Sequence, residues 1–115
     1  MTSMPTKNPL KPHLYYMLLS LSAGHRHGLA IARDVREFTH GQMTLWPAKL
    51  YGSIEDLSDA GWIEEIADGH RRPDDNERKR YYGLTRAGRA ALAAETTRLA
   101  DLVALARSIA KKERA

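Results

Sequence analysis

Apolar residues recur at helical spacing through the first half of the chain. Within residues 27–41, Ile31, Val35 and Phe38 occupy positions i, i+4 and i+7, and charged residues fill much of the space between them. We therefore expect an amphipathic helix with these three side chains in the core. The preceding segment, residues 13–24, is apolar on nearly every side. A helix of that kind must be covered on two faces, and in so short a chain this suggests a second subunit as one of the covers.

Residues 46–62 carry the sharpest helix signal. Leu50, Ile54 and Leu57 form an apolar stripe at the same spacing, and a glycine near the end of the segment can close the helix. Pro47 suits the first turn, because its missing N–H needs no partner there. The positions left to face outward are small or polar. They are Ala48, Lys49, Gly52, Ser53, Glu55, Asp56 and Asp59.

After this helix the hydrophobic period changes to that of a strand. Residues 62–67 and 80–85 are short segments rich in aromatic and β-branched side chains, and they flank a charged, proline-containing loop. We expect a β-hairpin there. Beyond it, an alanine- and leucine-rich run from Thr85, which can cap it, predicts one long helix. Glu95 is the one polar break in its a and d positions.

The predicted order is helix, helix, helix, strand, charged loop, strand, long helix. Three compact helices followed by a β-hairpin make a winged helix-turn-helix. The expected fold class is mainly α with a small β-hairpin, a winged helix-turn-helix plus a long C-terminal dimerisation helix. The stripe on the long helix has nothing left to cover in so small a domain, and we expect it to pair with a second copy.

Composition narrows the classes of function. The chain has 115 residues, enough for one domain, and no cysteine, which excludes disulfides and thiolate metal sites and fits a cytoplasmic location. No apolar run approaches the ~20 residues of a bilayer span, so we expect no membrane partner. His25 and His27 form an H-x-H pair without a third ligand at recognisable spacing, and a helix cap is the simpler role for His27. We expect no metal, no cofactor and no enzymatic activity.

The basic residues matter more for their position than for the net charge of +4. They gather at both ends of the charged loop, residues 71–80, where a wing would meet the DNA backbone. The helix over residues 47–61 would enter a major groove about 12 Å wide, which accounts for its small outer face. Lys49 could reach a guanine edge or a phosphate. The residues expected to contact double-stranded DNA are Thr44, Ala48, Lys49, Tyr51, Ser53, Arg71, Arg72, Arg78, Lys79 and Arg80.

Three motifs in this order resemble the PadR family of transcriptional regulators. They are "HG" with the amphipathic helix at 27–38, "P-x-x-L-Y-x-x-I-x-x-L-x-x-x-G-x-I" at 47–63, and "R-K-R-Y-Y-x-L-T-x-x-G" at 78–88. The resemblance covers nearly the whole chain and implies a homodimeric winged-helix repressor. The single C-terminal helix is similar to the smaller of the family's two size classes.

The resemblance also implies residue roles. Leu50 and Ile54 match core positions, and Tyr51 matches the tyrosine of the recognition helix. Lys49 stands where the family frequently has threonine, and Leu29 replaces the usual aromatic after "HG". These departures, together with "LW" before the proline, bear on the operator sequence rather than on the fold.

A second copy and a small aromatic ligand are the other expected partners. The expected dimer interface comprises Leu14, Tyr15, Leu18, Leu92, Leu99, Leu102, Ala106 and Ile109. Trp46 and Trp62 bracket the recognition helix and could be plain core residues. The sharper hypothesis places one of them in an effector cavity, where a planar molecule could stack, because some proteins that resemble this chain bind planar molecules between subunits.

The sequence divides into three expected parts: a flexible N-terminal arm over residues 1–12, a DNA-binding domain over 13–84 and a dimerisation helix over 85–115. Two functions remain open at this point. The first is a sequence-specific DNA-binding regulator, expected to be a homodimeric repressor of a palindromic operator. The alternative is a winged-helix adaptor that binds protein through its C-terminal helix without binding DNA.

Overall fold

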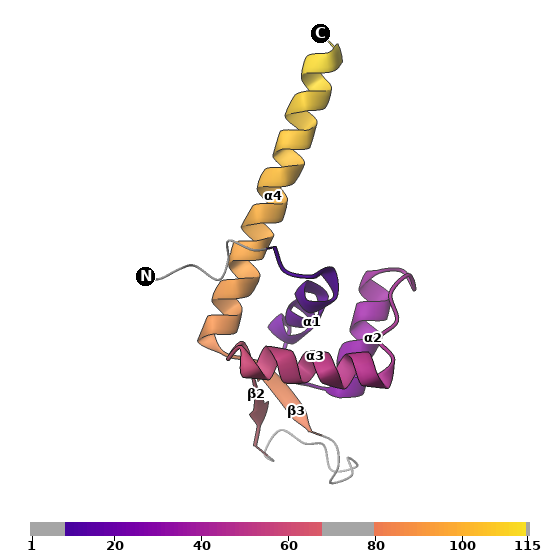
Figure 1. Cartoon of the computed structure of the whole chain (residues 1–115), viewed down its shortest axis with the longest axis vertical. Helices are drawn as coiled ribbons and strands as arrows, with labels where there is room; N and C mark the ends of the chain where they lie inside the picture. The colour runs from indigo at the N-terminus through magenta and orange to yellow at the C-terminus, as the bar shows by residue number, and fades with distance from the viewer. Residues whose placement is uncertain (1–8, 68–79, 115) are drawn as a thin grey trace.

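The computed structural model describes residues 9–67 and 80–114. These residues form four helices and three strands, as Figure 1 shows. The elements in chain order are α1 (Pro12–Ser22), β1 (Arg26–His27), α2 (Gly28–Phe38), α3 (Pro47–Asp59), β2 (Ile63–Ile66), β3 (Tyr81–Leu84) and α4 (Arg86–Arg114). The arrangement is the expected winged helix-turn-helix, mainly helical with a small sheet and a long C-terminal helix, so the predicted fold class is confirmed.

The sheet is antiparallel and has the strand order β1-β3-β2. The predicted hairpin is its β2–β3 pair, with Ile63 opposite Leu84 and Ile66 opposite Tyr81. The strand β1 is absent from the sequence-based prediction. It has two residues, Arg26 and His27, which form a strand only because they pair with β3.

Helix α1 lies inside the domain rather than on its surface. It contacts α2 along one side and α4 and β3 along others, and Met17, Leu18 and Leu21 are buried in the core. The expectation that a second subunit covers α1 through Leu18 is therefore wrong, since that side chain is 0% exposed within its own chain. Helix α4 of the same chain covers the face of α1 that was expected to meet a second subunit.

The apolar stripes of α2 and α3 point to the core with one exception. Ile31 and Val35 are buried, as are Leu50, Ile54 and Leu57. Phe38 is 42% exposed, because it is the last residue of α2, where the helix has passed the end of the core. Its expected place in the core is the one error in these stripes.

The predicted helix ends are confirmed in their hydrogen bonds. The imidazole Nδ1 of His27 accepts the N–H of Ala30 at 3.2 Å and caps α2. Thr85 caps α4, since its Oγ1 accepts the N–H of Gly88 at 3.0 Å and donates to the Gly61 carbonyl at 2.6 Å. Gly61 has a φ of +80°, the left-handed conformation in which glycine commonly ends a helix.

Two polar contacts to Asp34 hold the C-terminal half of α1 against its neighbours. At its C-terminal half, the buried hydroxyl of Ser20 donates to Asp34 at 2.7 Å, and Arg26 Nε lies 3.3 Å from the same carboxylate oxygen. These bonds tie α1, β1 and α2 together. A buried hydroxyl without such a partner would cost about 1–3 kcal/mol.

Glu95 of α4 accepts a backbone hydrogen bond from Leu10, near the start of the described residues. The carboxylate is 5% exposed, and Arg98 donates to both its oxygens at 2.9 and 2.6 Å. The Arg98 hydrogen bonds, aided by a backbone hydrogen bond from Leu10, hold the pKa of Glu95 below its usual value. The polar break in the apolar stripe is thus a buried, paired carboxylate near the end of the core.

Gly88 lies where α4 passes closest to the strand hairpin. A Cβ at this position would lie 1.9 Å from the carbonyl oxygen of Trp62, which already accepts the N–H of Thr85 at 3.1 Å. Because both groups are backbone, neither can move without shifting the start of β2 or α4. Glycine is therefore required here by close approach.

We predict that Gly88→Ala destabilises the protein by about 1–3 kcal/mol, the usual cost of overpacking. The matched control is Gly52→Ala in α3, where a Cβ meets nothing within 4 Å, and we expect it to stabilise by up to about 1 kcal/mol. Chemical denaturation of the two variants measures both effects. A Gly88→Ala variant as stable as the wild type would contradict the close approach.

Candidate nucleic-acid interface

Helix α3 presents a small, polar surface in its first half. Ala48, Lys49 and Gly52 are exposed, and so is Thr44 in the loop before the helix. Ser53 does not belong to this surface, since it is 3% exposed and faces the core side of α3. The interpretation of Ser53 as an outward DNA contact is therefore wrong. The true buried stripe is wider than the sequence pattern indicated and includes this serine.

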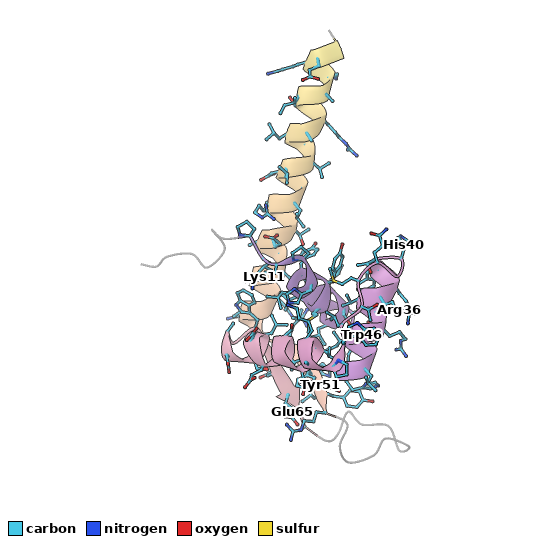
Figure 2. All side chains as sticks on the ribbon, turned by 45° about the vertical axis from the view of Figure 1, so that its right-hand side comes forward. Lys11, Arg36, His40, Trp46, Tyr51 and Glu65 are labelled. Atoms are coloured by element: carbon cyan, nitrogen blue, oxygen red, sulfur yellow. The ribbon has the colours of Figure 1, made fainter. Side chains whose placement is uncertain are left out.

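Tyr51 lies on the side of α3 that faces the start of α2. A Cβ on Gly28 would lie 3.0 Å from Tyr51 Cε1, so the ring rests on the backbone where α2 begins. Tyr51 remains 50% exposed. In Figure 2 it lies along the lower edge of α3, and Glu65 of β2 lies below it. The ring is thus held in place while one face stays open.

The two tryptophans occupy opposite ends of α3. Trp46 immediately precedes the helix and is 72% exposed. Trp62 follows it and packs, half-buried, against the core. Since the helix has 13 residues, the two lie about 20 Å apart along its axis at 1.5 Å per residue. They cannot line one cavity together.

Trp62 borders an open, largely apolar pocket of about 320 Å³. The other apolar walls come from the segment that leads into α1, from α1 itself and from the end of α3. The lining residues are Pro9, Leu10, Lys11, Leu14, Asp56, Leu57, Ala60 and Trp62. Trp46 does not border it.

A second open pocket, of about 250 Å³, lies between the start of α1 and the outer side of α3. Lys11, His13 and Lys49 line it together with Glu55 and Asp56. Burial lowers the pKa of His13, and the nearby ammonium groups of Lys49 and Lys11 lower it further, while Asp56 opposes them. This imidazole therefore loses its proton more readily than an ordinary histidine.

The sequence pattern did not anticipate Lys11 and His13 beside Lys49. Both residues fall in or next to the segment interpreted as a flexible arm, more than 30 positions before the recognition helix. Only the packing of α1 against the domain brings them there. The sequence around Lys49 does not indicate that Lys11 and His13 lie beside it.

Of the five basic residues expected in the wing, one can be described. Arg80 lies just before β3, is exposed, and has its Nη1 3.9 Å from a carboxylate oxygen of Glu65 on β2. An exposed pair at this distance contributes little to stability and leaves the guanidinium free to turn toward another anion. Arg71, Arg72, Arg78 and Lys79 lie outside the described residues.

The charge of α3 is divided along its length. Lys49 is in its first turn, whereas Glu55, Asp56 and Asp59 lie in its second half. Phosphates repel the second half and favour the first, which also carries the positive end of the helix dipole. A duplex would therefore meet α3 at its N-terminal half.

The outer half of α4 exposes an apolar surface. Leu102, Val103, Leu105 and Ile109 are each about half exposed, and Ala106 is exposed between them. Figure 1 shows this half of the helix projecting beyond the other elements. Of the remaining interface candidates, Leu14, Tyr15, Leu92 and Leu99 are partly exposed near the base of α4.

No group of three metal-ligating side chains occurs among the residues that the structure describes. None of the described helices is long and apolar enough to span a bilayer.

The comparison with protein-family models identifies one family. The model of the transcriptional regulator PadR-like family matches residues 17–94. The comparison with curated proteins finds no match.

Among solved structures, the chain is similar to a PadR family transcription regulator from Clostridium difficile R20291, with a TM-score of 0.72 and 17% identity over 86% of this chain and 98% of that one. It is also similar to RosR of H. salinarum, with a TM-score of 0.63 and 22% identity over 91% and 94% of the two chains. A third likeness, to the zinc-responsive MarR family member ZitR of Lactococcus lactis, has a TM-score of 0.63 and 14% identity over 97% and 69%. At these identities the likeness is one of fold.

Proposed function

The chain belongs to the PadR-like family of transcriptional regulators, and we propose that it acts as a homodimeric repressor at a palindromic operator. The family makes it a DNA-binding regulator rather than an enzyme. The alternative suggested by the sequence, an adaptor that does not bind DNA, does not fit this family. We further propose that it acts in the cytoplasm, where such a regulator would meet its DNA.

The observation that best supports the DNA contact is the exposed first half of α3. Its outward side chains are small, so the helix backbone can come close to base edges in a groove about 12 Å wide. In this proposal Ala48 lies against base edges, with Thr44 and Tyr51 beside it as sugar or phosphate contacts. Lys49 contacts a phosphate, because it lines the side of α3 that meets α1.

The wing supplies the second set of contacts in this proposal. Arg71, Arg72, Arg78, Lys79 and Arg80 bind phosphates or enter the minor groove beside the recognition helix. With six to ten phosphates neutralised per dimer, affinity falls by roughly 10³–10⁵ between 50 and 200 mM salt.

The dimer in this proposal forms through α4. Half-exposed leucine and isoleucine side chains repeat along its outer half, and they lose contact with water only if another helix covers them. With a two-fold axis between the α4 helices, the two α3 helices would contact half-sites near one helical turn apart.

The proposed division of the chain into three parts is unchanged. It has an N-terminal arm over residues 1–12, a DNA-binding domain over 13–84 and a dimerisation helix over 85–115.

We place the proposed aromatic effector at the Trp62 pocket. The pocket is open and largely apolar, and it lies between α1 and the end of α3. A planar molecule there could stack on the indole and press on the recognition helix. Trp46 is not part of this proposal, since it borders neither pocket described above.

We expect the protein to bind duplexes from a random pool in 50 mM salt, with log affinity falling linearly as log salt rises. Arg80→Ala removes one phosphate contact from each subunit, so it should weaken binding to all sequences alike and lower the salt slope of the dimer by about two. Lys111→Ala, which removes an equal charge from α4, is the control and should change neither. Fluorescence anisotropy measures both quantities, and failure to bind any duplex at low salt would refute DNA binding.

We predict that Leu102→Glu shifts the protein from dimer to monomer, because a carboxylate in the apolar surface would be buried without a partner. Ala104→Glu adds the same charge to an exposed position of α4 outside the stripe and should leave the dimer intact. Sedimentation velocity distinguishes the two species. A monomeric wild type at micromolar concentration would contradict the proposed assembly.

We predict that planar aromatic dyes quench the fluorescence of Trp46→Phe, which retains Trp62, and release its DNA. In Trp62→Phe, which retains the exposed Trp46, the same dyes should produce no saturable quenching. Titration of both variants compares the two indoles directly. Equal responses, or none, would remove the effector from the proposal.

A further inference from the structure

Three nitrogen-bearing side chains from separate parts of the chain line one pocket. Lys11 precedes α1, His13 lies in its first turn, and Lys49 lies in the first turn of α3. We call these three residues the basic cluster. Within the described parts of the chain, none of its members forms an ion pair.

The groups that face His13 come from both helices. Lys11 stands on its own segment, and Lys49 and Asp56 face it from α3, with Glu55 also lining the pocket. Lys49 is six and seven positions before these two carboxylates, about 9–10 Å along the helix. The pocket is therefore basic toward the start of α3 and acidic toward its end.

The basic cluster and the strands β2 and β3 lie on opposite sides of α3. Figure 1 shows α1 on one side of this helix and the strands β2 and β3 on the other. In Figure 2, Lys11 lies above α3, whereas Tyr51 and Glu65 lie below it. A helix in the major groove has a phosphate backbone on each side, so a duplex that reaches β2 and β3 on one side of α3 meets the cluster on the other.

The cluster is arranged to gain from an anion. Two ammonium groups, neither of which forms an ion pair with a described residue, lie beside an imidazole whose pKa is lowered by burial and by their charges. A phosphate would neutralise the ammonium groups and would accept a hydrogen bond from a protonated imidazole.

We propose that Lys11, His13 and Lys49 together bind one backbone phosphate of the operator, and that His13 takes up a proton when the phosphate binds. This inference rests on the proposed function, and it adds a contact from α1 and a response to pH. Operator affinity then rises as pH falls.

The direction follows from linkage. In the free protein the pKa of His13 is lowered, and a bound phosphate raises it again. Between the two values each subunit of the complex holds one more proton than a free subunit. A dimer that takes up two protons therefore gains up to about a hundredfold in affinity per unit fall in pH. Above the pKa of the complex, and below that of the free protein, this contribution is flat.

The test compares binding of one selected duplex between pH 5.5 and 8.5 at fixed salt. His13→Gln removes the titrating group from both subunits, and we expect it to lose up to about a hundredfold per pH unit of the wild-type dependence. His13→Lys carries a permanent charge, and we expect it to bind more tightly than the wild type at pH 8 with the same flattened profile. His40→Asn, an exposed histidine at the end of α2, is the control and should retain the wild-type profile.

Nuclear magnetic resonance of the His13 ring tests the site without relying on a variant. The titration midpoint should rise when the duplex is added, and it should stay unchanged with the same concentration of inorganic phosphate. A midpoint that does not move with the duplex would overturn the inference, and one that moves equally with free phosphate would overturn its assignment to the DNA backbone.

The outcomes separate the two levels of proposal. If no duplex binds at any pH, the proposed function fails. If the duplex binds and the wild type and His13→Gln have the same pH profile, the proposed function stands and this inference fails.

Discussion

The enclosure of α1 is the constraint on which the rest of the structure depends. Met17, Leu18 and Leu21 have no exposed surface to speak of, because α2 lies on one side of the helix and α4 and β3 on others. Burying three side chains of this size contributes roughly 1.5–3 kcal/mol each, as an upper estimate. The same packing sets the angle of α4, brings the start of α1 to the outer side of α3, and builds both surface pockets. The exposed side chains of α3 occupy their positions because α1 packs behind them.

The elements could be predicted from the sequence because their signals are local. Pro47, Gly61 and Thr85 define helix ends through their own backbone chemistry, and the apolar spacing of α2 and α3 defines their buried faces. The errors concern what a second element does to a first. Ser53 is buried because its neighbours cover a wider part of α3 than its three apolar residues indicate, and β1 exists only through its pairing with β3. The proximity of His13 to Lys49 had no local signal of any kind.

The residues that determine the fold differ from the exposed residues of α3 to which we assign DNA contacts. A structure with 17% identity to this chain reaches a TM-score of 0.72, so the fold tolerates replacement of most side chains. In this chain the fold depends on a pattern of apolar spacing and on close backbone approaches such as that of Gly88 to Trp62. The outer face of α3 is under no such packing constraint. Lys49 and Trp46 are exposed there, and side chains of this kind can vary with the operator while the domain stays the same.

Because α4 is long, a small change in the direction of its first turn moves its far end by several ångströms. The helix has 29 residues, about 43 Å at 1.5 Å per residue, and its first turn is fixed by the Thr85 cap and the carbonyl of Trp62. A rod of this length turns a tilt of ten degrees at one end into a displacement of about 7 Å at the other. In the proposed dimer, joined through the outer halves of α4, the separation of the two α3 helices would accordingly depend on a few backbone atoms at the start of each α4. A change there would alter the length of DNA that the pair can span before any base-contacting side chain had changed.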